Sequence, residues 1–129
     1  MVRFEHSFTV SGADIDRQAH ANNVAYVRWI QEVAVAHWQA AASETRQAEL
    51  TWVVVRHEID YLKPAFENEQ ITAETFVGKA TAATCERFTE IRRKDVLLAK
   101  ARSVWCLLDR QTLKPRRIDG EMKELFGMN

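Results

Sequence analysis

Polar residues of the types that catalyse acyl transfer crowd into one segment, just before a long apolar stretch. Two carboxylates, Asp14 and Asp16, are followed by His20 and by the paired amides Asn22 and Asn23. A helix that begins at such a pair offers unpaired backbone N–H groups and a partial positive charge, which can hold a carbonyl oxygen. A nearby carboxylate can then attack the carbonyl carbon or activate a water molecule. By type alone, the same residues are also common in turns and helix caps.

A strand and a long helix are predicted on either side of this segment. Residues 2–10 alternate between apolar and polar types, as in a half-buried strand. Residues 24–42 are apolar or strong helix formers around most of a helical circumference, which predicts a helix buried on nearly every side. Asn22 and Asn23 are good caps for its start, and the polar residues 43–49 separate it from the next predicted strand.

Strand patterns dominate the rest of the chain. Strands are predicted at residues 51–62, 71–78, 84–93 and 96–109. The third of these is expected to carry its charged residues on an exposed face, and a short helical turn is predicted at residues 118–126. Because parallel strands need long crossovers, four strands without intervening helices predict an antiparallel sheet, expected to wrap around the helix. The order of elements therefore predicts an α+β protein.

Composition and charge exclude several classes of protein. The chain has 129 residues without a linker or repeat, which predicts a single domain over residues 1–129. Its 18 Lys+Arg and 18 Asp+Glu balance, unlike the strongly basic domains that bind nucleic acid. No apolar run approaches the roughly 18 residues of a membrane span, and no secretory pattern, metal ligand set or cofactor-binding loop is visible. Cys85 and Cys106 are too few for a disulfide framework, so reduced thiols in a cytoplasmic protein are expected.

The spacing of the polar residues resembles a known signature. The pattern D-x-x-x-H-x-N-N-x-x-Y of hot-dog-fold acyl-CoA thioesterases is matched by Asp16, His20, Asn22, Asn23 and Tyr26. The 4-hydroxybenzoyl-CoA thioesterase-like family, with its long-chain acyl-CoA members, is the most similar group, and residues 54–65 and 109–116 also resemble its strands. The resemblance implies a hot-dog fold, in which a five-stranded antiparallel sheet wraps one long central helix. It also implies homodimers or homotetramers with sites at subunit interfaces, near the start of that helix.

The same resemblance implies catalytic roles for three residues. Asp16 takes the position of the catalytic carboxylate, which acts either as a nucleophile on the thioester carbonyl or as a general base toward water. Asn23 provides its backbone N–H at the helix start to polarise the thioester oxygen. His20 tunes Asp16, helps the thiol to leave, or makes only a structural hydrogen bond. Ala19 departs from the glycine that many relatives carry before the histidine.

Four further residues are candidates for substrate binding. Tyr26 either lines the acyl pocket or packs in the core, and Asn22 either contacts the substrate or caps the helix. Arg92 and Arg93 belong to a basic cluster, with Arg87 nearby, that can bind the phosphates of coenzyme A. Alternatively, that cluster is an ordinary solvated strand face.

The expected activity is hydrolysis of an acyl-CoA to a free carboxylic acid and CoA, without a cofactor. Two alternatives remain open. A thioesterase acting on acyl-carrier protein uses the same chemistry with a different carrier. A non-catalytic hot-dog module would keep the pocket for acyl-CoA binding alone. The acyl group itself, aryl or fatty, is not readable from the sequence.

Overall fold

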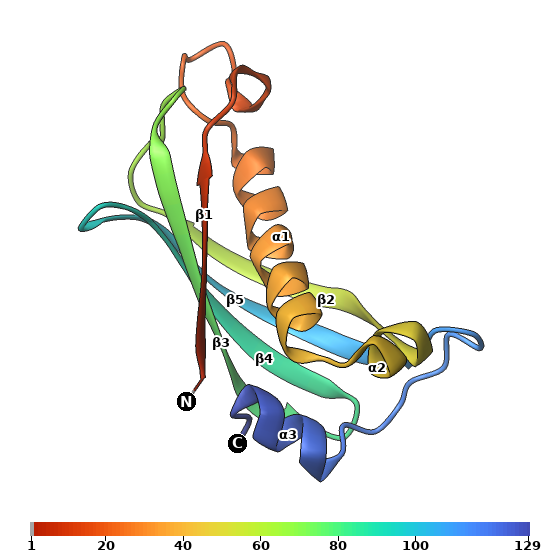
Figure 1. Ribbon diagram of the computed structural model, residues 1–129. Coiled ribbons are helices and arrows are strands. Elements are labelled where there is room, and N and C mark those ends of the chain that lie inside the picture. Colours follow the sequence, from red (N-terminus) through yellow and green to blue (C-terminus); the bar gives the residue numbers. More distant parts are fainter. Residues whose placement is uncertain (1) are drawn as a thin grey trace.

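Five antiparallel strands form one twisted sheet in the computed structural model, which describes residues 2–129 (Figure 1). The strands are β1 (Arg3–Thr9), β2 (Leu50–Tyr61), β3 (Gln70–Thr81), β4 (Thr84–Arg93) and β5 (Val96–Asp109). Their order across the sheet is β1-β3-β4-β5-β2, so β1 and β2 are its edges. Every neighbouring pair is antiparallel, which confirms the predicted sheet.

A single long helix, α1 (Asn23–Ala41), lies along one face of this sheet (Figure 1). The arrangement confirms the predicted α+β hot-dog fold. The side of α1 that faces the sheet buries Ala25, Tyr26, Trp29, Ile30, Val33, Ala34, His37 and Trp38. Within residues 2–129, no helix is both long and apolar enough to cross a membrane.

The prediction that α1 is buried on nearly every side is wrong for the single chain. The sheet covers one face of the helix, and the opposite face reaches solvent. Val24 and Val35 on that face are 76% and 46% exposed. Apolar residues all around a helix show which side chains can be buried. They do not show that the same chain has an element to cover the side of the helix that faces away from the sheet.

Three short helical segments complete the chain: η1 (Gly12–Asp14), α2 (Glu44–Glu49) and α3 (Gly120–Phe126). The sequence did not predict α2, because all of its residues lie outside the core and they show no helical spacing of apolar residues. Ser43 caps α2 by accepting a hydrogen bond from the N–H of Arg46 at 3.2 Å. The α3 helix begins two residues later than predicted, where Asp119 caps the N–H of Met122 at 2.8 Å.

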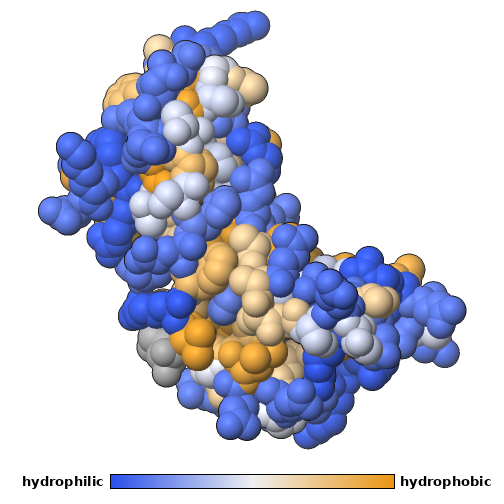
Figure 2. All heavy atoms as spheres, in the orientation of Figure 1, coloured by the Kyte–Doolittle hydropathy of each residue, from blue (hydrophilic) through white to orange (hydrophobic). Residues whose placement is uncertain are grey.

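Two groups of buried side chains fill the space between α1 and the sheet. The first lies along the N-terminal half of α1 and includes Trp29 and Ile30. The second lies along the C-terminal half and includes Trp38, Trp105 and Phe126. Figure 2 shows apolar residues gathered on the surface over the lower part of α1 and toward α3, beside the second group. Apolar side chains therefore pack along both halves of α1, in two separate clusters.

Candidate active site

Asp16 lies in a tight turn between η1 and α1. Its carboxylate Oδ1 accepts a hydrogen bond from the backbone N–H of Gln18 at 2.8 Å, and its own N–H donates to the carbonyl of His20 at 3.1 Å. A bridge between Ile15 and Ala21 closes the turn. The side chain is half-buried, and its Oδ2 has no hydrogen-bond partner among residues 2–129. One oxygen of Asp16 is thus held in place while the other stays available.

The turn needs a left-handed backbone at Ala19, where φ is 65°. The N–H of Ala19 donates to the carbonyl of Asp16 at 3.1 Å, which tightens the turn. In this conformation a Cβ atom crowds the following carbonyl oxygen, so glycine is the favoured residue. This is the position at which many relatives carry glycine, and the chain adopts the turn with alanine there.

Asp14 anchors the same loop from the inside. It is 2% exposed, accepts a hydrogen bond from the N–H of Ser11 at 3.1 Å, and pairs with the guanidinium of Arg28 on α1. Burial by itself raises the pKa of this carboxyl, but the hydrogen bonds from Arg28 and Ser11 outweigh it and lower the pKa below its ordinary value. Asp14 therefore stays ionised and ties the loop to α1.

The α1 helix begins beside this turn with two unpaired backbone N–H groups. Asn22 caps the helix, because its Oδ1 accepts a hydrogen bond from the N–H of Ala25 at 2.9 Å. The N–H groups of Asn23 and Val24 have no acceptor within the described part of the chain, residues 2–129. Together with the helix dipole, these donors can hold a carbonyl or oxyanion oxygen.

Tyr26 is built into the core one turn further along. Its side chain is 3% exposed, and its ring packs against Trp29 with centroids 4.9 Å apart. Its hydroxyl accepts a hydrogen bond from the N–H of Ala65 at 3.1 Å and donates to the carbonyl of Lys63 at 3.3 Å. Burial raises the pKa of Tyr26. The hydroxyl joins α1 to the segment that follows β2.

His20 shares the turn with Asp16 through the backbone. Its ring Nδ1 is 3.2 Å from the carbonyl oxygen of Ala21. A ring that donates through Nδ1–H leaves Nε2 free to accept a proton. No hydrogen bond joins the His20 ring to the Asp16 carboxylate in the structure of residues 2–129.

Arg92 and Arg93 end β4, and each pairs with a glutamate. Arg92 Nη2 donates to Glu90 at 3.0 Å. Arg93 Nη1 donates to Glu69 at 2.9 Å and to the carbonyl of Pro64 at 3.0 Å. That carbonyl belongs to the segment after β2, which is anchored to the N-terminal half of α1. Arg93 therefore lies at the same end of the molecule as the Asp16 turn.

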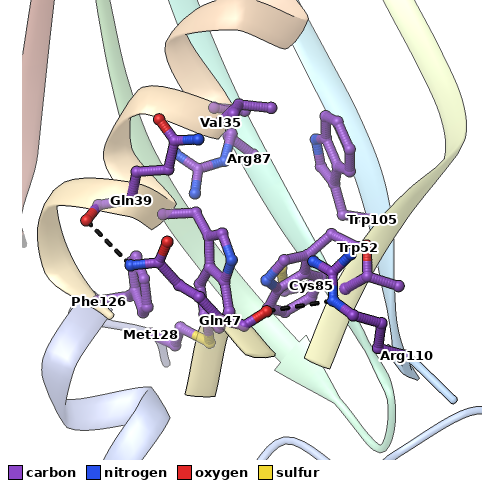
Figure 3. Close-up of a pocket in the computed structure, with 13 residues that line it drawn as sticks. Val35, Gln39, Gln47, Trp52, Cys85, Arg87, Trp105, Arg110, Phe126 and Met128 are labelled. Atoms are coloured by element: carbon purple, nitrogen blue, oxygen red, sulfur yellow. Dashed lines mark hydrogen bonds between the residues drawn. The ribbon is translucent and has the colours of Figure 1, made fainter. Parts of the chain in front are cut away.

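A cavity of about 230 Å³ lies at the other end of α1 (Figure 3). The C-terminal half of α1 forms one wall, strands β2, β4 and β5 form the other, and α2 and the chain end close it. Aromatic rings provide much of the surface, from Trp38, Trp52, Trp105 and Phe126. Two hydrogen bonds drawn in Figure 3 fasten the rim, since Gln47 donates to the carbonyl of Gln39 and accepts at its own carbonyl from Arg110, each at 3.2 Å.

Arg87 on β4 is buried in the wall of this cavity, with 7% exposure. The prediction that β4 carries its charged residues on an exposed face is wrong for this residue. Its Nη1 donates to Nδ1 of His37 on α1 at 3.0 Å and to the hydroxyl of Thr75 at 3.1 Å. Burial lowers the pKa of Arg87 to about 10, which leaves it charged at neutral pH. Burial, helped by the charge of Arg87, lowers the pKa of His37 to about 4, so its ring is neutral.

The sequence does not announce the pair of Arg87 and His37, because the two residues lie 50 positions apart and neither belongs to a motif. One signal was available. Arg87 shares its parity along the strand with Cys85 and Ile91, which both face the core. A charged residue at an inward position of a strand is a candidate for function or for a buried polar contact.

One known family matches nearly the whole chain. The profile described as the acyl-ACP thioesterase N-terminal domain matches residues 1–126. The chain belongs to this family. The resemblance to hot-dog thioesterases is thereby confirmed, while the narrower likeness to 4-hydroxybenzoyl-CoA thioesterases and long-chain acyl-CoA members stays a prediction. No curated protein matches this chain.

Solved structures share the fold of this chain at low sequence identity. Slr0204 from Synechocystis, a 1,4-dihydroxy-2-naphthoyl-CoA thioesterase, is 15% identical with a TM-score of 0.82, over 98% of this chain and 96% of that one. SAV2348 from Staphylococcus aureus, solved in complex with CoA, is 15% identical with a TM-score of 0.84, over 98% and 82%. A candidate oleoyl thioesterase from Lactobacillus plantarum is 18% identical with a TM-score of 0.88, over 99% of this chain but 52% of that one.

Proposed function

We propose that this chain hydrolyses acyl thioesters of coenzyme A, with Asp16 as the catalytic carboxylate. The observation that carries the proposal is the free oxygen of Asp16, held in a fixed turn directly before the unpaired N–H groups of Asn23 and Val24. Membership of a thioesterase family supports thioester chemistry. A structure with the same fold was solved in complex with CoA, which supports CoA as the carrier.

The chemistry follows from these positions. The thioester carbonyl oxygen accepts hydrogen bonds from the N–H groups of Asn23 and Val24, which stabilise the negative charge that develops on it. Oδ2 of Asp16 then either attacks the carbonyl carbon, giving an anhydride that water hydrolyses, or takes a proton from the attacking water. Both routes break the C–S bond, and the departing sulfur takes up a proton. His20 lies in the same turn and is the candidate for passing that proton from water to the sulfur, by accepting it at Nε2 and then releasing it.

A second copy of the chain completes the proposed site. β2 is an edge strand, so the backbone groups along its outer side are unpaired within residues 2–129. Val53 and Val55 on this edge are 42% and 63% exposed. Antiparallel pairing of β2 with a second β2 through a twofold axis would place both α1 helices on the same face of one joined sheet.

The two ends of β2 explain what this pairing would bring together. At one end, the Tyr61 hydroxyl donates to the carbonyl of Asn23 at the start of α1, at 3.4 Å. At the other end, Trp52 packs edge-on against Trp38 in the cavity wall, with centroids 5.9 Å apart. Antiparallel pairing sets the first end of one copy beside the second end of the other. The Asp16 turn of one copy then faces the aromatic cavity of its partner, in a homodimer or in a homotetramer of two such pairs.

Arg92 and Arg93 are the remaining candidates that can bind the substrate in this arrangement. Their side chains are 38% and 27% exposed, so each can exchange its glutamate for a phosphate of coenzyme A. Tyr26 and Asn22 have structural roles instead, since the Tyr26 hydroxyl and the Asn22 Oδ1 are already engaged within the chain.

One observation favours a second candidate function. The family that matches the chain is described by its acyl-carrier-protein substrate, so the same site can serve an acyl-ACP thioesterase. The chemistry at Asp16 is identical, and the two functions differ in the surface that meets the carrier. Rates of hydrolysis for the same acyl group on CoA and on acyl-carrier protein distinguish them.

The test is an assay of thiol release from purified protein, over acyl-CoAs with short, long and aromatic acyl groups and over the matching acyl-carrier proteins. The proposal expects turnover of at least one thioester. Release of no thiol from any of them would contradict it. Tight binding of acyl-CoA without turnover would instead identify a non-catalytic binding module.

A further inference from the structure

Arg87 is a buried cation without an acidic partner. The residue is 7% exposed, and no ion pair among residues 2–129 involves it. The other arginines without a carboxylate partner are exposed: Arg17, Arg110 and Arg117. Burying a charge without a counter-charge is costly, because the solvation lost on burial is not replaced. Such a residue is expected where a ligand supplies the missing charge.

The free donors of Arg87 match an anion with two oxygens. Arginine has five N–H donors in a planar fork, and the two contacts to His37 and Thr75 both use Nη1. Nε and Nη2 have no acceptor in the described part of the chain. These two nitrogens form the edge of the guanidinium that binds a carboxylate through two parallel hydrogen bonds.

A second unmet donor lies in the same wall. The indole Nε1 of Trp105 is buried and has no hydrogen-bond partner among residues 2–129. Ser103 pairs with Arg87 across β4 and β5. Trp105 is two residues beyond Ser103, so it lies on the same face of the sheet as Arg87 and is the diagonal neighbour of Arg87. Neutral His37 adds no charge of its own beside Arg87. The cavity wall therefore holds a positive charge and, buried within the wall, one donor without a partner.

The size of the cavity limits what can carry the anion. A volume of about 230 Å³ has room for several apolar carbon atoms and a carboxylate, but not for a long fatty chain. Trp38, Trp52, Phe126 and Met128 line it and suit an apolar chain. An adipoyl group, whose far carboxylate follows four methylene carbons, is one group of this kind.

We propose that the cavity binds a carboxylate on a short apolar chain, and that Nε and Nη2 of Arg87 hold this carboxylate. Resting on the proposed function, the structure points to an acyl substrate that ends in a carboxylate, with its thioester at the α1 start of a second copy. The other source of the same chemistry is a free fatty acid that enters the cavity by its carboxylate. Arg87 is then the residue that sets specificity for the acyl group.

The first test compares kcat/KM for adipoyl-CoA and hexanoyl-CoA, which have the same chain length and differ in the far carboxylate. The wild type is expected to prefer adipoyl-CoA by tenfold or more, and Arg87→Gln is expected to lose this preference. Arg117→Gln, which removes an exposed cation outside the cavity, serves as the matched control and keeps the preference. Arg87→Lys keeps the charge without the planar fork, so it loses most of the preference, and it replaces Arg87→Gln if that variant does not fold.

The second test does not depend on turnover. Binding of hexanoate and of 1-hexanol is measured by calorimetry for the wild type and Arg87→Gln. Hexanoate binding that requires Arg87, without a preference for adipoyl-CoA, supports a free fatty acid as the source of the carboxylate. Equal rates for the two thioesters together with hexanoate binding unaffected by Arg87→Gln would overturn the proposal. If no thioester is hydrolysed, the proposed function fails, and hexanoate binding still decides the role of Arg87.

Discussion

Replacing Tyr26 by phenylalanine removes one oxygen atom and tests whether this residue belongs to the core or to the chemistry. The hydroxyl accepts the N–H of Ala65, which is 0% exposed, and donates to the carbonyl of exposed Lys63. Without the hydroxyl, the buried N–H of Ala65 has no acceptor within residues 2–129, whereas the Lys63 carbonyl can turn to water. We therefore expect Tyr26→Phe to destabilise the fold and to leave kcat unchanged.

The expected loss comes from the single buried donor. An unsatisfied buried N–H costs about 1–3 kcal/mol, so the free energy of unfolding should fall by about 2 kcal/mol. At roughly 4 °C per kcal/mol for a chain of this size, Tm should fall by about 8 °C.

Urea unfolding at one fixed protein concentration measures this loss, because assembly would otherwise change the apparent stability. Tyr61→Phe is the matched control, since the Tyr61 ring is 42% exposed and its hydroxyl makes only a 3.4 Å contact with the Asn23 carbonyl. The control should lose less than about 0.5 kcal/mol. A Tyr26→Phe protein as stable as the wild type, or one with normal stability and a collapsed kcat, would refute the reasoning.

Two further predictions concern His37 and Ala19. His37 has a pKa of about 4 in the fold against an ordinary 6.5, so the unfolded chain takes up the proton more readily and the free energy of unfolding falls as pH drops from about 6.5 to about 4. At 1.36 kcal/mol per pKa unit this loss is at most about 3 kcal/mol, and urea unfolding between pH 7 and pH 5 should show it in the wild type but not in His37→Gln. Ala19→Gly relieves a left-handed alanine that costs about 1–2 kcal/mol, but it frees the unfolded chain by about 0.4–1 kcal/mol. A gain of up to about 1 kcal/mol is expected in thermal unfolding, and a clear loss of stability would contradict it.

Local patterns predicted most of the fold. Alternation of side chains, together with enrichment in β-branched and aromatic residues, located all five strands, because both patterns suit a strand with a buried face. The start of α1 was also readable, since the amide of Asn22 satisfies an N–H group that every helix leaves unpaired at its first turn. These features depend on residues that are close together in the sequence, so they can be predicted from the sequence alone.

Features that depend on contacts between distant elements were not predictable. The pair of Arg87 and His37 exists because the sheet and α1 bring together residues 50 positions apart. The exposure of the apolar residues Val24 and Val35 on α1 was not predictable for the same reason, since their side chains do not show whether this chain or a second copy covers them. The α2 helix has no buried residue and therefore no period to detect.

The candidate site was readable in part. The types and spacing of Asp16, His20 and Asn23 indicated a carboxylate before a helix start, and the structure places Asp16 and His20 in one turn just before α1, which begins at Asn23. The sequence could not choose between two roles for Tyr26, because a tyrosine one turn into a helix can point to a pocket or bridge to another element. Its hydrogen bonds to the segment after β2 show that it bridges.

The rate of thiol release by Asp16→Asn tests the central claim most directly. Asparagine keeps an oxygen that can accept the N–H of Gln18, so the turn and the stability should be preserved, while the negative charge is lost. With a thioester that the wild type hydrolyses, kcat is expected to fall by roughly 100-fold or more, at a Tm equal to that of the wild type. Asp95→Asn, at an exposed hairpin position, should keep the wild-type rate. A folded Asp16→Asn protein that releases thiol as fast as the wild type would contradict the assignment of Asp16 as the catalytic carboxylate.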